Sequence, residues 1–199
     1  MTHPLPCFPP LFPPGGWWRI FMGLRLGGAN ESQAIAGANE RCGLMSRHWM
    51  RMRLVQESAF SFSVKGGAST LKNKPSILWV MAEEAERELP RYAATLATLY
   101  GRTPFHHLLA PDLMPSFTPG AKAGDVCIDC FRKVLAIILP DQEHLVGLLR
   151  QAARNGDSRL ADISDGFGAR FNPELSIVDA IMHLGPDAIF PLVMSFKSL

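Results

Sequence analysis

The stretch that decides the fold lies near the carboxyl end and reads Asp165-Gly-Phe-Gly-Ala-Arg-Phe-Asn-Pro-Glu-Leu-Ser-Ile-Val-Asp-Ala-Ile-Met-His-Leu-Gly-Pro-Asp187. It predicts a glycine-rich turn, an extended approach and then one capped helix. Ser176 is the expected N-cap, and Asp179 can complete a capping box. Apolar side chains then recur at helical spacing, at Ile177, Ala180, Ile181 and Leu184. Gly185 in a left-handed conformation and Pro186 after it are expected to end the helix.

Outward from this stretch, the sequence divides into three parts of one domain, residues 1–199. Residues 1–16 form a proline-rich arm with few backbone donors to offer a sheet. Residues 17–75 are predicted to be rich in strands, because apolar and polar side chains alternate in their second half. Residues 76–199 are predicted to be helical, because their apolar side chains recur with helical spacing.

The expected elements follow from these patterns. In the strand-rich part they are a helix at 17–22, a strand at 24–26, a loop over 27–41 and strands at 50–55 and 59–64. In the helical part they are helices at 76–89, 90–99, 105–109, 125–139, 141–154, 177–184 and 186–194, with Ser76 as a cap and Pro90 at the start of a separate helix. The sequence therefore predicts an α+β or α/β fold, in which a small β-rich amino-terminal half carries a helical carboxyl-terminal half packed on it.

Charge is unevenly distributed along the chain. Residues 1–74 hold nine Lys and Arg against three Asp and Glu, whereas residues 75–199 hold eleven against fifteen. An ordinary solvated surface is the commonest reason for such a difference, and a partner that carries phosphate is the next. Because the basic residues are scattered rather than clustered, a small phosphorylated or sugar ligand is favoured over nucleic acid.

Cysteine usage and hydropathy indicate a cytoplasmic protein. Four cysteines do not make a disulfide framework in a chain of this length, no apolar run is long enough to cross a membrane, and the first residues do not resemble a signal peptide. Cys127 and Cys130 have Cys-x-x-Cys spacing, but they share one apolar stripe of a predicted helix with Phe131 and Val134, which favours core packing. No further ligands stand at zinc spacing, so neither a metal nor a cofactor is expected.

Three histidines are candidates for functional residues. His106 and His107 are adjacent, so on a helix their side chains point about 100° apart and cannot aim at one centre. One of them could act as a general base or contact a phosphate, and a plain surface position is the alternative. His183 lies near the end of a predicted helix, where a cation interacts favourably with the helix dipole. These residues alone do not specify a reaction.

Four segments resemble motifs of one known family. Gly166-Phe with Asn-Pro-Glu-Leu-Ser-Ile-Val-Asp and Gly-Pro-Asp-Ala resembles its closing motif, and Tyr100-Gly-Arg-Thr-Pro-Phe105 resembles its Tyr-Gly-x-Ser-Pro-Phe-Phe. Phe12-Pro-Pro before Trp17 resembles its amino-terminal proline-aromatic turn. Glu31 and Arg41 fall where a His-Glu-Asn-Tyr … Arg-Asn-Arg-Cys segment would place them. The family that these motifs resemble is the WbqC-like family.

Members of that family are typically encoded beside enzymes of surface-polysaccharide and amino-sugar synthesis. The resemblance implies a transferase or accessory protein of surface-polysaccharide (O-antigen-like) biosynthesis that acts on a nucleotide-linked or amino sugar. It implies Glu31 and Arg41 as catalytic residues, Glu31 as a base or as an acceptor of a sugar hydroxyl and Arg41 as a phosphate clamp. Arg102, His107 and Trp17 are the residues expected to bind substrate.

The chain also departs from the family pattern at polar positions. Ile35 stands where the family has lysine, Asn39-Glu40 replaces an Arg-Asn pair, and Tyr92 replaces a histidine found in many members. These departures support an alternative, in which the chain is a diverged, non-catalytic binding or scaffold protein of the same family.

Overall fold

A computed structural model describes residues 8–44, 49–55, 58–65, 82, 85–139 and 173–189. Of these residues, 57% are helical and 11% are in strands or isolated bridges. The helices are α1 (Gly15–Leu26), α2 (Glu31–Arg41), α4 (Ala85–Tyr100), α5 (His106–Leu109), α6 (Ala123–Ile138) and α9 (Ile177–Leu184). The strands β1 (Arg51–Val55) and β2 (Ser58–Ser61) form one antiparallel hairpin.

The prediction of a β-rich amino-terminal half is wrong. Alternation correctly located the hairpin, where Met52, Leu54 and Phe60 are buried. However, the only sheet in the described part of the chain has two strands, and two helices precede it. Helix α1 runs through residues 24–26, where a strand was expected, and α2 occupies most of the expected loop over 27–41.

Helix α2 was missed because its buried face is narrow and made mainly of small side chains. Only Ala34, Ile35, Ala38 and Asn39 are buried, so the apolar periodicity is weak. The start signal was nevertheless present in the sequence. The Asn30 side chain accepts a hydrogen bond from the Gln33 backbone N–H (2.9 Å), and the Gln33 side chain accepts one from the Asn30 N–H (3.0 Å), which forms a capping box.

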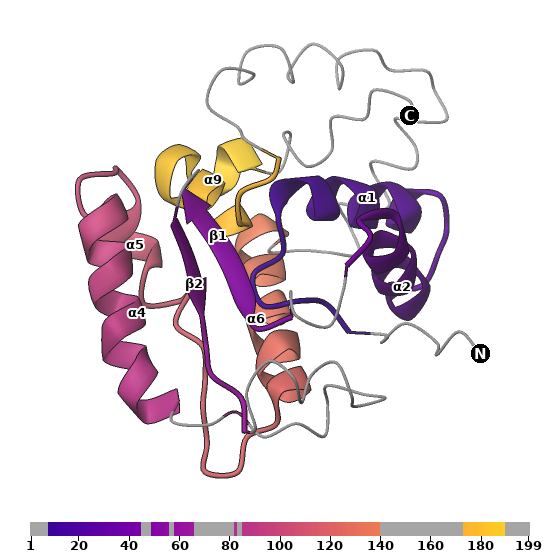
Figure 1. Ribbon diagram of the computed structural model, residues 1–199. Coiled ribbons are helices and arrows are strands. Elements are labelled where there is room, and N and C mark those ends of the chain that lie inside the picture. The colour runs from indigo at the N-terminus through magenta and orange to yellow at the C-terminus, as the bar shows by residue number, and fades with distance from the viewer. Residues whose placement is uncertain are drawn as a thin grey trace.

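The hairpin lies between two groups of helices (Figure 1). Helix α4 runs along one side of it, α1 and α2 lie on the other side, and α6 passes behind it in this view. Helix α9 lies across the end of the hairpin, close to where β1 ends. This arrangement brings a segment from the end of the chain against segments from its beginning and its middle.

Helix α4 is one helix that runs through Pro90, so the prediction of separate helices at 76–89 and 90–99 is wrong. Pro90 falls in the second turn, where it removes one backbone hydrogen bond near the helix start. The helix continues because Tyr92, Leu96 and Tyr100, each four residues apart, form a buried face. Residue 76 lies outside the described residues.

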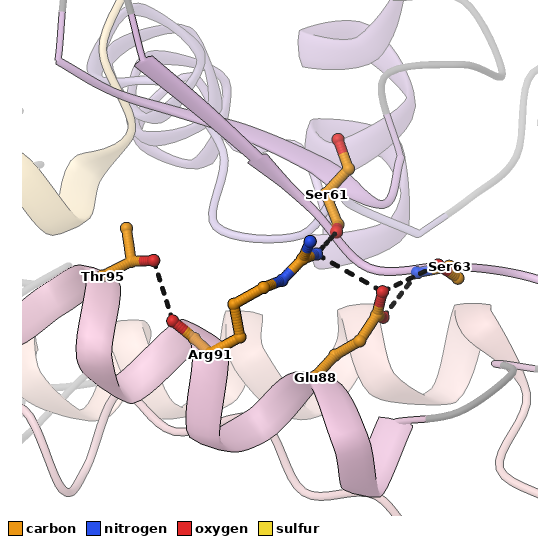
Figure 2. Close-up of polar contacts among 5 residues, drawn as sticks. All are labelled: Ser61, Ser63, Glu88, Arg91 and Thr95. Atoms are coloured by element: carbon orange, nitrogen blue, oxygen red, sulfur yellow. Dashed lines mark hydrogen bonds and ion pairs between the residues drawn. The ribbon is translucent and has the colours of Figure 1, made fainter.

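Polar contacts hold α4 to β2 and to the residues that follow it (Figure 2). The backbone N–H and the hydroxyl of Ser63 donate to the Glu88 carboxylate at 2.6 and 2.7 Å. The Arg91 guanidinium donates to the Ser61 carbonyl at 3.1 Å and lies over the Phe60 ring at 4.7 Å. These contacts fix the position of the helix that carries Tyr100.

The described part of the proline-rich arm, residues 8–14, packs into the core. Phe8, Leu11 and Phe12 are buried. The Asn39 amide of α2 donates to the Phe8 carbonyl at 3.0 Å and accepts from the Trp17 indole N–H at 2.9 Å. The arm therefore completes the core, and a buried amide links it to both amino-terminal helices.

Helix α6 forms the other wall of the aromatic core, as its apolar stripe predicted. Phe131 stacks on Trp18 with ring centroids 5.2 Å apart, and Trp17 stacks on Phe21 at 5.3 Å. Cys127 and Cys130 are fully buried in the same stripe, which confirms that they pack in the core. Burial raises the pKa of both thiols well above the usual value, so they stay protonated.

Two further predictions concern the carboxyl-terminal part. The short helix at 105–109 is confirmed by α5, and residues 186–189 are helical as expected. The helix at 141–154 and the turn from Gly166 lie outside the described residues. None of the helices within the described ranges is long and apolar enough to cross a membrane.

Candidate functional site

The start of α9 is tied to two distant parts of the chain. The Ser176 hydroxyl donates to the Phe12 carbonyl (3.0 Å) and accepts from the Val178 N–H (3.3 Å), which confirms Ser176 as the N-cap. The Ser176 N–H donates to the Arg53 carbonyl at 2.6 Å, and the Ile177 N–H donates to the Pro13 carbonyl at 3.0 Å. The arm and β1 thereby fix the position from which α9 begins.

Three polar side chains meet where α4 and α9 pack together, and we call them the Tyr-Asp-His cluster (Tyr100, Asp179 and His183). The His183 Nδ1 atom lies 2.9 Å from the Asp179 carbonyl oxygen and 3.6 Å from its carboxylate oxygen. The Tyr100 ring meets the imidazole edge to face, with centroids 5.7 Å apart. Asp179 thus faces Tyr100 and His183. It does not complete the expected capping box, and Ser176 alone supplies the side-chain cap of α9.

Burial shifts the pKa values of the carboxylic and phenolic groups of this cluster. It raises the pKa of Asp179, and the neighbouring His183 and Tyr100 side chains partly oppose that rise. Burial and the neighbouring Asp179 carboxylate raise the pKa of Tyr100 far above its ordinary value. The Tyr100 hydroxyl therefore keeps its proton, which it donates to the Leu54 carbonyl at 2.5 Å.

The surroundings of His183 determine which ring nitrogen can react. The two oxygens near Nδ1 are the backbone carbonyl oxygen and one carboxylate oxygen of Asp179. Both can only accept hydrogen bonds, so Nδ1 carries the proton. In the neutral imidazole, Nε2 then has the free lone pair. The His183 side chain is 44% exposed, whereas that of Asp179 is 11% exposed. Solvent can therefore reach the imidazole of His183, whose orientation is fixed by Asp179 through Nδ1.

Helix α5 packs against the end of α9, beside the cluster. Gly185 has a φ of +76°, and a Cβ atom placed there would lie 2.4 Å from the Phe105 ring. Glycine is required for both reasons, and the sequence predicted its left-handed conformation. The turn between α4 and α5 contains Arg102, which is exposed and lies two residues after Tyr100.

The residues expected to form the site do not gather in one place. Glu31 and Arg41 are both exposed and are the first and last residues of α2, so they lie about 15 Å apart along the helix axis. Helix α2 packs against α1, whereas the Tyr-Asp-His cluster lies between α4 and α9 (Figure 1). His107 is exposed on α5, and Trp17 is fully buried in the aromatic core.

Sequence reasoning missed the Tyr-Asp-His cluster, although two signals were available. Asp179 and His183 are four residues apart, which places them on one face of a helix. The sequence pattern also offers each of them a separate role, Asp179 as a capping residue and His183 as a partner of the helix dipole. Tyr100 opens one of the motifs that resemble the WbqC-like family, and Asp179 belongs to another. The structure brings those two motifs into contact.

The described residues do not gather three or more His, Cys, Asp or Glu side chains in the way that a metal site requires.

Comparison with known proteins found no match: no protein-family model, no curated protein and no solved structure is similar to this chain. The resemblance to the WbqC-like family therefore stays a prediction that rests on the quoted motifs.

Proposed function

We propose that the protein is a cytoplasmic transferase of surface-polysaccharide synthesis that acts on a nucleotide-linked or amino sugar, with His183 as its general base. The observation that carries this proposal is the geometry of the His183–Asp179 pair. The Nδ1 atom of His183 contacts Asp179, and the His183 side chain is 44% exposed to solvent. The substrate class comes from the resemblance, and the geometry supports an acid–base role.

In the proposed reaction, Nε2 of His183 accepts the proton of an acceptor hydroxyl or amine. The acceptor then bonds to the anomeric carbon of the donor sugar, and the bond from that carbon to the phosphate oxygen breaks. The nucleotide leaves with the electron pair of the broken bond. Asp179 holds the ring in position and stabilises the imidazolium that forms, and the Tyr100 ring packs edge to face against the imidazole.

Arg102 is the cation best situated to receive the phosphate groups of such a donor. It is exposed and follows Tyr100 directly through Gly101, and the hydroxyl of Thr103 donates to the Tyr100 carbonyl at 2.7 Å, which closes the turn. A guanidinium binds phosphate through two parallel hydrogen bonds. This proposal retains Arg102 from the expected substrate-binding residues.

Two measurements test the proposal, beginning with binding. A panel of nucleotide sugars is screened by thermal denaturation, where a true ligand at a hundred times its Kd stabilises the folded protein by about 2.7 kcal/mol. The stabilising donor is then incubated with candidate acceptors, and released nucleotide is quantified by mass spectrometry. A screen in which no nucleotide sugar stabilises the protein would contradict the proposed substrate class.

The role of His183 is tested by comparing His183→Gln with Arg132→Gln, since both residues are exposed but only His183 faces Asp179. Loss of a general base costs about 10²–10⁴-fold in turnover, so we expect that loss for His183→Gln and full activity for Arg132→Gln. Wild-type turnover by His183→Gln would reject the assigned role.

The alternative, a diverged non-catalytic binding or scaffold protein, has its own support. Glu31 and Arg41 are exposed at opposite ends of α2, and Ile35 and Asn39 are buried in packing contacts at positions where the family has polar groups. This alternative predicts that a sugar nucleotide binds without turnover and that His183→Gln leaves the cellular function unchanged. A single-turnover experiment distinguishes the two proposals.

A further inference from the structure

The β1–β2 hairpin has one buried face and one solvent face that carries positive charge. Arg51 and Arg53 are exposed on that face, opposite Ser61 and Ala59 of β2, which are also exposed. We call these four residues the hairpin face. Arg51 and Arg53 are two residues apart on one strand, so their side chains leave the same side about 7 Å apart.

The charges of the hairpin face are poorly matched within the protein. Opposite charges across a strand pair are favourable, but the cross-strand partners here are a serine and an alanine. Arg53 pairs with Glu174 at 3.0 Å, and both side chains are more than half exposed (51% and 73%), so the pair is weak and can exchange for another anion. In the described part of the chain, no carboxylate pairs with Arg51.

The hairpin face also lies beside the start of α9. The Arg53 carbonyl accepts the Ser176 N–H at 2.6 Å, and Glu174, the partner of the Arg53 side chain, precedes α9 by three residues. Figure 1 shows β1 ending close to α9. A chain-like ligand bound along β1 would therefore extend toward the helix that carries Asp179 and His183.

We propose that the hairpin face binds an acidic saccharide chain through its carboxylate groups. Guanidinium groups bind carboxylates bidentately, and the cross-strand neighbours of the two arginines are the small, exposed residues Ala59 and Ser61. Single-stranded nucleic acid is disfavoured, because the four residues of this face include no aromatic side chain on which a base could stack. The choice of a saccharide rests on the proposed function, whereas the choice of an anion rests on the arginines.

The test uses the full chain and a short oligogalacturonate, with the fully methyl-esterified oligomer as the uncharged control. Binding is measured by titration calorimetry. We expect Arg51→Gln and Arg53→Gln each to weaken binding about tenfold, since each removes charge-assisted hydrogen bonds. Arg132→Gln is the matched control, because Arg132 is exposed on α6 and makes the same change of net charge. Melting temperatures confirm that all three variants fold.

Five outcomes would overturn the proposal: no binding of oligogalacturonate by the wild type, equal binding of the esterified oligomer, wild-type affinity in both hairpin variants, an equal loss in Arg132→Gln, or tighter binding of single-stranded DNA than of oligogalacturonate. His183→Gln separates this proposal from the transferase proposal. Oligogalacturonate binding that survives in His183→Gln supports the hairpin face whether or not turnover is found. Turnover without any oligogalacturonate binding retains the transferase and rejects the hairpin face.

Discussion

Helix α2 displays its charged residues to solvent, whereas the corner between α4 and α9 encloses most of its polar groups. Glu31 and Arg41 stand exposed at the two ends of one helix. Tyr100 and Asp179 are buried, and only His183 of the Tyr-Asp-His cluster reaches solvent to a large extent. Both regions contain residues that could transfer protons or bind anions, but only the second holds them against one another.

This difference teaches how to weigh polar residues in a sequence of unknown function. A charged residue at a helix end is already well placed by the helix dipole, so it needs no further role. A carboxyl group that is buried against a tyrosine and a histidine costs free energy to ionise and needs partners.

Replacing Trp17 tests whether that residue belongs to the core or to a ligand site. Trp17→Ala should lower the free energy of unfolding by about 3–5 kcal/mol, because it empties a fully buried position and leaves Asn39 without one hydrogen-bond donor. Urea denaturation measures the change. Trp17→Phe, which keeps a ring, should cost less, and a Trp17→Ala protein as stable as the wild type would contradict the core position.

Replacing Gly185 tests the contact that places α5 against α9. Gly185→Ala should lower the free energy of unfolding by about 3 kcal/mol, because it adds backbone strain at a positive φ and a clash with the Phe105 ring. Gly28→Ala is the matched control, since Gly28 also has a positive φ but has open space around it. Equal costs for the two variants would mean that the Phe105 contact contributes nothing.

The pH dependence of stability tests the burial of Asp179. Its pKa in the folded protein is raised above the ordinary value of 3.8, so the folded state binds more protons than the unfolded state between those two values. This group therefore stabilises the fold at low pH, and that contribution is lost as pH rises through the raised pKa. Asp179→Asn should remove this part of the pH dependence.

The measurement is a pair of urea titrations at acidic and neutral pH, for the wild type and for Asp179→Asn. The stability of the variant relative to the wild type should rise with pH. Asp187→Asn is a suitable control, because Asp187 is exposed just beyond α9. A relative stability of Asp179→Asn that falls with pH would show a depressed rather than a raised pKa.

The smallest effects are expected on α2. Glu31→Gln and Arg41→Gln should each change the free energy of unfolding by less than about 0.5 kcal/mol, which is typical of surface substitutions. They should also leave turnover and nucleotide-sugar binding unchanged. A loss of activity comparable to that of His183→Gln would show that Glu31 and Arg41 belong to the functional site, and it would contradict the distinction between α2 and the Tyr-Asp-His cluster.

The fold was predictable wherever one segment carried its own pattern. Alternation located both strands of the hairpin, and the apolar stripe located α6 with its two buried cysteines. Prediction failed for α2, whose small side chains give a weak pattern, and at Pro90, where the buried face of α4 outweighs one lost hydrogen bond. The missed α2 and the strand expected at 24–26, which is the end of α1, account for the wrong prediction of a β-rich amino-terminal half.

The candidate site was much less predictable than the fold. Arg102 was a candidate from the sequence because it lies within a recognisable motif, but the meeting of Tyr100 with Asp179 and His183 involves residues far apart in the sequence. No spacing rule connects the end of α4 to the middle of α9. The charged residues expected at the site instead, Glu31 and Arg41, were those that the resemblance to the WbqC-like motifs indicated.

The sequence by itself determined the local features of this protein: the cap of α9 at Ser176, the left-handed Gly185 and the buried stripe of α6. These depend on hydrogen bonds and side-chain spacing within a few residues, so they can be read from the order of the amino acids. Only the tertiary structure decided that Trp17 belongs to the core and that Asp179 lies between a tyrosine and a histidine. Those positions depend on how distant segments pack, and packing is set by the whole chain rather than by any one stretch of it.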